Sequence, residues 1–229
     1  MKLLLFDVDM TLISTGGAGL RALNRACQKI LEIDDAMDGI TPSGKTDPSI
    51  VREILASRCP DRSSADCFGS IIDLYLTFLR DEVEKTTVYR VLPGILSVLE
   101  EMSARTDVLL GLATGNVEPG ARIKLERGNL NRYFSFGGFG SDSENRTELV
   151  RRAAELAGRQ NGSKIAPENV FVIGDTPLDV AAGREAGFHT VGVATGKYTF
   201  DELADCGASL VIRDFEQGRD QFLRTTFME

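Results

Sequence analysis

Two aspartates separated by one residue follow the first apolar run of the chain. Apolar residues 3–6 lead into Asp7, and Asp9 and Thr11 follow at intervals of two. Two carboxylates this close repel each other unless a cation or a proton relieves the repulsion. A hard ion such as Mg²⁺ prefers oxygen ligands and would also neutralise a phosphoryl group. The pattern predicts metal-assisted phosphoryl chemistry, although an acidic loop after a strand would give the same letters.

A second apolar run also ends in an aspartate. Residues 170–174 lead into Asp175, and Asp179 follows four positions later, where a helical pattern starts. Beside the first pair, Asp175 would complete a metal site, and Asp179 would be a further ligand or would hold one in place. The alternative is that Asp175 is the N-cap of the helix, a common position for aspartate before a proline-containing first turn.

A third apolar run ends in a hydroxyl and two small polar positions. Residues 109–113 precede Thr114, Gly115 and Asn116. The threonine hydroxyl and the free amides that follow it suit a tetrahedral anion such as phosphate. The same three residue types also occur in ordinary turns. Their position at a third strand end favours a phosphate-binding role.

Chemistry on an anionic substrate also needs a cation, and the sequence offers Lys124 and Arg146. The alternative is that either side chain lies on the solvated surface, as most lysines and arginines do. Lys124 is preferred, because a compact ammonium fits beside a metal and two carboxylates better than a guanidinium does. The chain has a single histidine, His189, which argues against a histidine-nucleophile phosphatase and against a histidine-rich zinc hydrolase.

The elements that must position these residues alternate along the chain. Short Val-, Ile- and Leu-rich runs are separated by amphipathic stretches, which predicts an α/β fold with a Rossmann-like parallel sheet flanked by helices. Ligands in such sheets bind beyond the carboxyl ends of the strands, so the three motifs are expected to converge. The expected strands are 2–8, 108–114, 170–174, 190–194 and 209–212, and the expected helices are 95–104, 119–129, 144–158 and 178–186.

One long segment breaks the alternation. Residues 14–89 contain consecutive helical patterns at 19–31, 47–57 and 64–84. They predict a small α-helical cap domain at 15–90, inserted into a catalytic core made of 1–14 and 91–229. Glycines and a proline near residues 15–17 and 92–94 are plausible hinges.

Composition limits the partners. Asp plus Glu outnumber Lys plus Arg by 34 to 26, for a net charge of −8, which argues against a nucleic-acid or anionic-membrane partner. A small anionic substrate stays compatible, because local cations can dominate a pocket. No apolar run reaches membrane-span length and the first is too short for a signal peptide, so a cytoplasmic protein is expected. The four cysteines lack CxxC spacing and are expected to be free thiols.

Four segments of the chain resemble the four motifs of the haloacid dehalogenase-like superfamily. In chain order they are residues 7–11, Thr114, a basic residue and residues 174–179. The block after the first motif resembles the C1 cap of its phosphoglycolate phosphatase-like branch. The resemblance implies a mobile cap, nucleophilic attack on phosphorus by Asp7, and acid–base catalysis by Asp9. It also implies Mg²⁺ held by Asp7, the backbone carbonyl of Asp9 and Asp175, with support from Asp179.

The basic residue departs from this resemblance, because members of the branch often carry Lys-Pro where residues 144–147 read Glu-Asn-Arg-Thr. Either Arg146 takes that role or Lys124 reaches in from its helix. Residues 41–47 resemble the cap loop that contacts the leaving group, so Lys45 is a candidate for substrate specificity. Equally, this loop would simply cap the helix that starts near Asp47.

The sequence thus predicts a Mg²⁺-dependent phosphomonoester hydrolase that acts on a small phosphorylated metabolite through an aspartyl phosphate. Asp9 argues against a dehalogenase, because the dehalogenases of the superfamily lack a carboxylate at that position. The alternatives are a sugar phosphomutase of the same superfamily and a non-catalytic phosphate-binding regulatory protein. Side chains of the cap, which the sequence does not place, decide the physiological substrate. The protein is expected to be a monomer or a homodimer.

Overall fold

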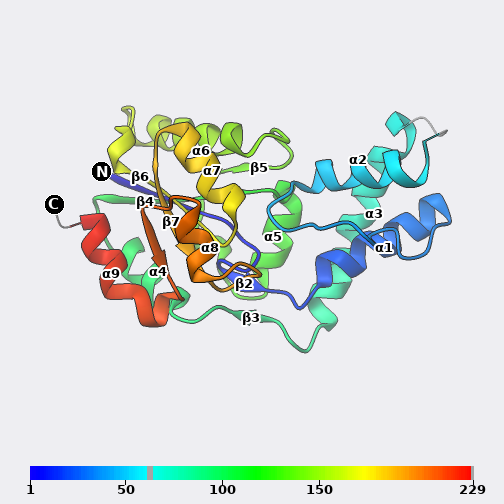
Figure 1. Cartoon of the computed structure of the whole chain (residues 1–229), viewed down its shortest axis with the longest axis horizontal. Helices are drawn as coiled ribbons and strands as arrows, with labels where there is room; N and C mark the ends of the chain where they lie inside the picture. The colour runs from blue at the N-terminus through cyan, green and yellow to red at the C-terminus, as the bar shows by residue number, and fades with distance from the viewer. Residues whose placement is uncertain (61–63, 228–229) are drawn as a thin grey trace.

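The computed structural model describes residues 1–60 and 64–227, which form a six-stranded parallel sheet beside a block of helices (Figure 1). The strand order is β5-β4-β1-β6-β7-β8. The predicted α/β fold with a Rossmann-like sheet is confirmed. The strands are β1 (Lys2–Phe6), β4 (Val108–Thr114), β5 (Gly137–Phe139), β6 (Val170–Gly174), β7 (His189–Val193) and β8 (Leu210–Ile212).

Strand β1 lies in the middle of the sheet and is buried on both faces. Leu4 and Phe6 belong to one apolar cluster, and Leu3 and Leu5 belong to another. This alternation follows from the two-residue period of a strand, and it explains why the run is apolar at every position. Because β4 and β6 pair with β1 on its two sides, the residues that follow these three strands lie at one edge of the sheet.

Helices cover both faces of the sheet (Figure 1). α4 and α9 pack on the cluster that contains Phe6, and α6 and α7 pack on the cluster that contains Leu5. Short 3₁₀ turns precede β5 and β6. The helices are α4 (Ile95–Ser103), α5 (Glu118–Glu126), α6 (Arg146–Asn161), α7 (Pro177–Ala186), α8 (Phe200–Asp205) and α9 (Phe215–Phe227), and the 3₁₀ turns are η1 (Asn131–Tyr133) and η2 (Pro167–Asn169).

The remaining helices form a separate block beside the carboxyl edge of the sheet (Figure 1). They are α1 (Ala18–Leu31), α2 (Asp47–Arg58) and α3 (Ser64–Lys85), each within one residue of its expected bounds. Their buried faces make a largely separate apolar cluster, to which the core contributes Val117. We propose that residues 15–90 are a cap domain, and we call them the cap below.

The two connections between the cap and the core lie side by side. β2 (Ile13–Ser14) and β3 (Arg90–Val91) pair antiparallel, and the amide of Leu92 donates to the carbonyl of Leu12 at 3.0 Å. Strands of two residues leave no periodic signal, so only the hinge residues beside them were foreseeable. Within the described part of the chain, no helix is long and apolar enough to cross a bilayer, and the four cysteines are free.

Candidate active site

Three sheet strands and the cap enclose one cavity at the carboxyl edge of the sheet. Asp7 follows β1, Thr114 ends β4 and Asp175 follows β6. All three side chains line a cavity of about 290 Å³, which residues of the cap also line. Parallel neighbouring strands end at the same edge, so segments more than a hundred residues apart meet here.

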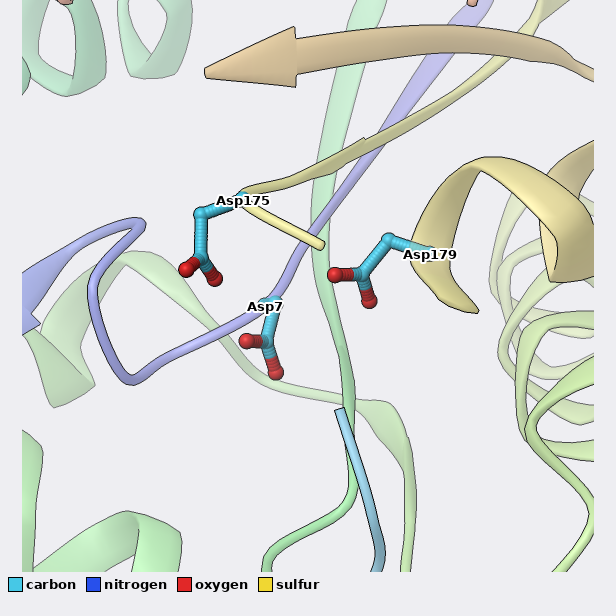
Figure 2. A group of neighbouring side chains, drawn as sticks. All are labelled: Asp7, Asp175 and Asp179. Atoms are coloured by element: carbon cyan, nitrogen blue, oxygen red, sulfur yellow. The ribbon is translucent and has the colours of Figure 1, made fainter. Parts of the chain in front are cut away.

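Three buried carboxylates face one another in this cavity. One oxygen each of Asp7, Asp175 and Asp179 lies within 4.8 Å of the others, and Figure 2 shows the three side chains converging from β1, β6 and α7. Burial and the neighbouring charges of Asp179 and Asp9 raise the pKa of Asp7 to about 7, although Arg146 opposes the shift. Burial, with the charges of Asp179 and Asp7, raises the pKa of Asp175 to about 9.

The donor set of this acidic cluster suits a divalent cation. Carboxylate oxygens are the ligands that Mg²⁺ prefers, and a cation would offset both the burial of these charges and their mutual repulsion, which raise the two pKa values. The carboxylate of Asp9 lies outside the group. It contacts Lys124 and Asn116 instead. Of the two roles that the resemblance implies for Asp9, that of metal ligand is thus left to its backbone carbonyl.

The start of α7 holds Asp179 in place. The amide and the hydroxyl of Thr176 donate to the Asp179 carboxylate at 3.1 and 2.7 Å, and the Asp179 amide donates back to the hydroxyl. Thr176 is therefore the N-cap, and the alternative that Asp175 caps this helix is excluded. A Cβ at Gly174 would lie 2.3 Å from the Asp179 carboxyl carbon, so only glycine admits the carboxylate here.

The two candidate cations occupy different parts of the site. Arg146, the first residue of α6, forms ion pairs with Asp179 and, at 3.5 Å, with Asp7. Lys124 on α5 lies 2.5 Å from the Asp9 carboxylate. The preference for Lys124 as the cation beside the acidic cluster therefore needs correction. Arg146 holds that place, because α6 begins beside the β1 and β6 ends whereas Lys124 enters from the cap side.

Both cations are buried and both stay charged. Burial by itself would lower the pKa of Lys124 and of Arg146. Asp9, Tyr75 and Asp47 together outweigh burial and raise the pKa of Lys124. Asp179 and Asp7 do the same for the pKa of Arg146. The site therefore offers two fixed positive charges: Arg146 beside Asp7 and Asp179, and Lys124 beside Asp9.

The side chains of the third motif orient the two aspartates. The Thr114 hydroxyl donates to Asp7 and accepts from the Asn116 side-chain amide at 2.9 Å. That amide also donates to Asp9 at 2.9 Å, while its oxygen accepts from Lys124 at 2.5 Å. At Gly115 the core backbone closely approaches the cap backbone, because a Cβ there would lie 2.3 Å from the Lys45 carbonyl oxygen.

Two cap residues at the site escaped the sequence reasoning. The Asp47 carboxylate accepts from the amide of Val117 at 2.9 Å and from the hydroxyl of Tyr75. Burial raises the pKa of Asp47 to about 6, although Lys124 opposes the shift. In the sequence, Asp47 looks like an ordinary first-turn acid and Tyr75 belongs to the apolar stripe of α3. Neither carries a signal that separates it from its neighbours.

Lys45 lines the cavity but already has a partner. Its ammonium lies 2.5 Å from the Glu53 carboxylate on α2. Thr46 is the N-cap of α2 and forms a capping box with Ser49. The loop therefore caps its helix and also lines the cavity.

Comparison with known proteins places this geometry in a family. The family model described as haloacid dehalogenase-like hydrolase matches residues 4–193. A phosphoglycolate phosphatase from Rhodospirillum rubrum is 24% identical over 220 residues, covering 93% of this chain and 88% of the relative. A phosphoglycolate phosphatase from Aquifex aeolicus is 25% identical over 195 residues, covering 83% of each.

Solved structures show the same fold. A hydrolase from Pseudomonas syringae superposes with a TM-score of 0.75 at 20% identity, covering 97% of this chain and 98% of that one. The resemblance and the fold expected from the motifs are confirmed, and the names of the relatives support the predicted enzyme class, a phosphatase. The chain belongs to the haloacid dehalogenase-like hydrolase family.

Proposed function

We propose that this chain is a Mg²⁺-dependent phosphomonoester hydrolase that transfers the phosphoryl group of a small metabolite to Asp7 and then to water. One observation carries the proposal. Two aspartates two positions apart lie in different environments: Asp7 belongs to the buried acidic cluster, and Asp9 lies between Lys124 and Asn116. Paired carboxylates in different surroundings are how one site runs nucleophilic and acid–base chemistry together. The curated relatives named phosphatases support the same activity.

The nucleophile is Asp7. Its carboxylate attacks phosphorus, the ester P–O bond breaks, and the leaving oxygen takes a proton from Asp9. The Thr114 hydroxyl and Arg146 hold the Asp7 carboxylate in orientation. A divalent cation bound by the acidic cluster would neutralise the phosphoryl oxygens and favour the ionised carboxylates.

Asp9 serves both half-reactions. After it has protonated the leaving group, its carboxylate removes a proton from the water that cleaves the aspartyl phosphate, which restores both aspartates. Its side chain is 39% exposed, so it reaches the cavity, while Lys124 and Asn116 fix its orientation. Such general acid–base help is worth about 10²- to 10⁴-fold in rate.

A substrate panel tests the proposal. Phosphate release should require Mg²⁺ and should be lost in Asp7→Asn. With a hexose 1-phosphate, an isomerised sugar phosphate would indicate the phosphomutase, and free phosphate indicates the hydrolase. The fold alone does not separate them, because a candidate β-phosphoglucomutase from Bacteroides vulgatus shares it at a TM-score of 0.72 and 18% identity. No release from any substrate would favour the non-catalytic alternative. The expected cytoplasmic location and the monomeric or dimeric state stay predictions.

The metal-free protein should lose stability as the pH rises from about 4 to about 9. The pKa of Asp7 is raised from 3.8 to about 7 and that of Asp175 to about 9. The folded state therefore holds protons that the unfolded chain has released, and the free energy of unfolding falls as the pH rises. The stabilisation is fully present below about pH 4 and is lost as the pH passes the two folded pKa values. Thermal melts in EDTA across this range measure it.

Mg²⁺ should reverse this loss, because metal binds the deprotonated carboxylates and its effect on Tm then grows with pH. Asp175→Asn removes one of the raised pKa values and should flatten both the pH dependence and the Mg²⁺ effect. A Tm near pH 9 that does not respond to Mg²⁺ would contradict the metal assignment.

Removing the Asp47 carboxylate should lower kcat/KM by roughly one order of magnitude. In Asp47→Ala the Val117 amide and the Tyr75 hydroxyl lose their acceptor, and buried donors without partners cost about 1–3 kcal/mol each. The contact between α2 and the Thr114–Val117 turn then loosens beside Lys124. Steady-state kinetics measure the effect, and Asp73→Ala, at an exposed position of α3, is the control. Equal kcat/KM values in both variants would show that the Asp47 carboxylate does not contribute to the active site.

A further inference from the structure

We propose that this enzyme selects phosphomonoesters whose leaving group is uncharged and partly apolar, and that it discriminates against leaving groups that carry a second anion. The inference rests on the proposed function and names the substrate class of the same site. Two observations carry it: the cations that line the cavity are already paired with carboxylates, and part of the wall that the cap contributes is apolar.

Every cation that lines the cavity, among the residues that the structure describes, is already paired. Arg146 is bound to Asp7 and Asp179, Lys124 to Asp9, and Lys45 to Glu53. Lining carboxylates outnumber these cations by four to three; they are Asp7, Asp9, Asp47 and Asp175. A Mg²⁺ ion and a phosphate dianion would cancel each other's charge. The cavity therefore holds no surplus positive charge for a substrate carboxylate.

Lys45 is a cavity-lining cation that the cap contributes, and Glu53 neutralises it. The two side chains are 33% and 42% exposed and their charged atoms are 2.5 Å apart. An exposed pair of this kind is weak, so Lys45 can turn away from Glu53. Glu53 would still repel an anion that approaches Lys45, because charges closer than the Debye length of about 8 Å are only partly screened. The pair thus acts as a charge filter, which we call the Lys45–Glu53 pair.

Another part of the wall is apolar. Leu20 and Leu23 lie three residues apart on one face of α1, and Met37 and Ile50 complete the surface. Leu23, Met37 and Ile50 are buried in the apolar cluster of the cap, whereas Leu20 is 43% exposed although it is a large apolar residue. A leaving group with an apolar surface would cover Leu20 and remove that surface from water.

The wall also contains hydroxyl groups and, within the described part of the chain, no cation without a partner. Ser14 and Ser43 line the same cavity and can meet an alcohol group of a substrate. Neutral polar groups are therefore tolerated, and a carboxylate is not. This separates the chain from its relatives named phosphoglycolate phosphatases, because phosphoglycolate carries a carboxylate on its leaving group.

Phosphate release from ethyl phosphate, butyl phosphate and phosphoglycolate tests the proposal in the Mg²⁺-loaded full-length protein. We expect kcat/KM for ethyl phosphate to exceed that for phosphoglycolate at least about tenfold, because a buried carboxylate without a partner is costly. We also expect a gain in kcat/KM from ethyl to butyl phosphate of roughly fourfold for each buried methylene. Phosphoglycolate equal to or better than ethyl phosphate would overturn the inference. Failure to release phosphate from all three and from p-nitrophenyl phosphate would instead overturn the proposed function.

The Lys45–Glu53 pair gives a second test that does not depend on folding of a damaged site. Glu53→Gln frees Lys45, so the preference for ethyl phosphate over phosphoglycolate should narrow by roughly fivefold, and by less at high salt. Glu84→Gln removes the same charge from an exposed position of α3 and should leave the ratio unchanged. A ratio that is the same in Glu53→Gln and Glu84→Gln would overturn the charge filter.

Discussion

Asp7→Asn is expected to lower phosphate release by at least about a thousandfold, the scale on which covalent catalysis depends on its nucleophile. An amide oxygen is a poor nucleophile and cannot form the acyl phosphate. The amide keeps the shape of the side chain, so the Thr114 hydroxyl still has an acceptor. Initial rates at saturating Mg²⁺ measure the loss, and it should appear in kcat for every substrate of the panel.

The same substitution should not harm the fold, and this separates a chemical effect from a structural one. Asp7 is one of three buried carboxylates within 4.8 Å of one another. Removing one negative charge from such a group relieves repulsion. In EDTA near pH 8, the Tm of Asp7→Asn should therefore equal or exceed that of the wild type. Turnover above about a tenth of the wild-type value would refute Asp7 as the nucleophile.

Arg146→Met and Lys124→Met should both lower kcat by about 10²-fold or more, because each removes a charge-stabilising group from the active site. The two variants should differ in their affinity for Mg²⁺. Arg146 lies against Asp7 and Asp179, two of the three cluster carboxylates, and it competes for them with any metal. Its removal should therefore tighten Mg²⁺ binding while it slows turnover. Lys124 contacts Asp9, outside the cluster, so its removal should leave Mg²⁺ affinity almost unchanged.

Calorimetric titration with Mg²⁺ and steady-state kinetics measure the two effects separately. Arg152→Met is the matched control, because Arg152 lies on the same helix with a half-exposed side chain and pairs only loosely with Asp142 at 3.6 Å. Arg146→Lys keeps the charge and should recover part of the rate. A change in Mg²⁺ affinity in Lys124→Met but not in Arg146→Met would reverse the assignment of the two cations.

Most of the sheet could be predicted because its strands are short apolar runs bounded by polar residues. β4 and β6 were expected with the bounds that they have, since both are buried on both faces. β5 was not expected, because its sequence Gly-Gly-Phe carries no periodic signal and pairs only through β4. The last helix, α9, was also missed: Gly218, Thr225 and several charges dilute its apolar stripe.

The carboxylates of the site could be predicted for a geometric reason. Parallel neighbours bring their carboxyl ends to one edge, so an acid after β1 and an acid after β6 must lie close whatever the loops do. The positions of the two cations could not be predicted in the same way. Whether Lys124 or Arg146 faces Asp7 depends on how α5 and α6 pack, and the Asp47–Tyr75 contact depends on where α2 and α3 meet the core. These are tertiary contacts without a local signature.

Trapping the aspartyl phosphate with borohydride tests the central claim most directly. Borohydride reduces an acyl phosphate to an alcohol, so protein quenched during turnover should carry homoserine in place of one aspartate. The tryptic peptide 3–21 contains both Asp7 and Asp9, and fragmentation in the mass spectrometer separates them. We predict substrate- and Mg²⁺-dependent reduction at Asp7 alone. Reduction at Asp9, or turnover with no reduced aspartate in that peptide, would contradict the account.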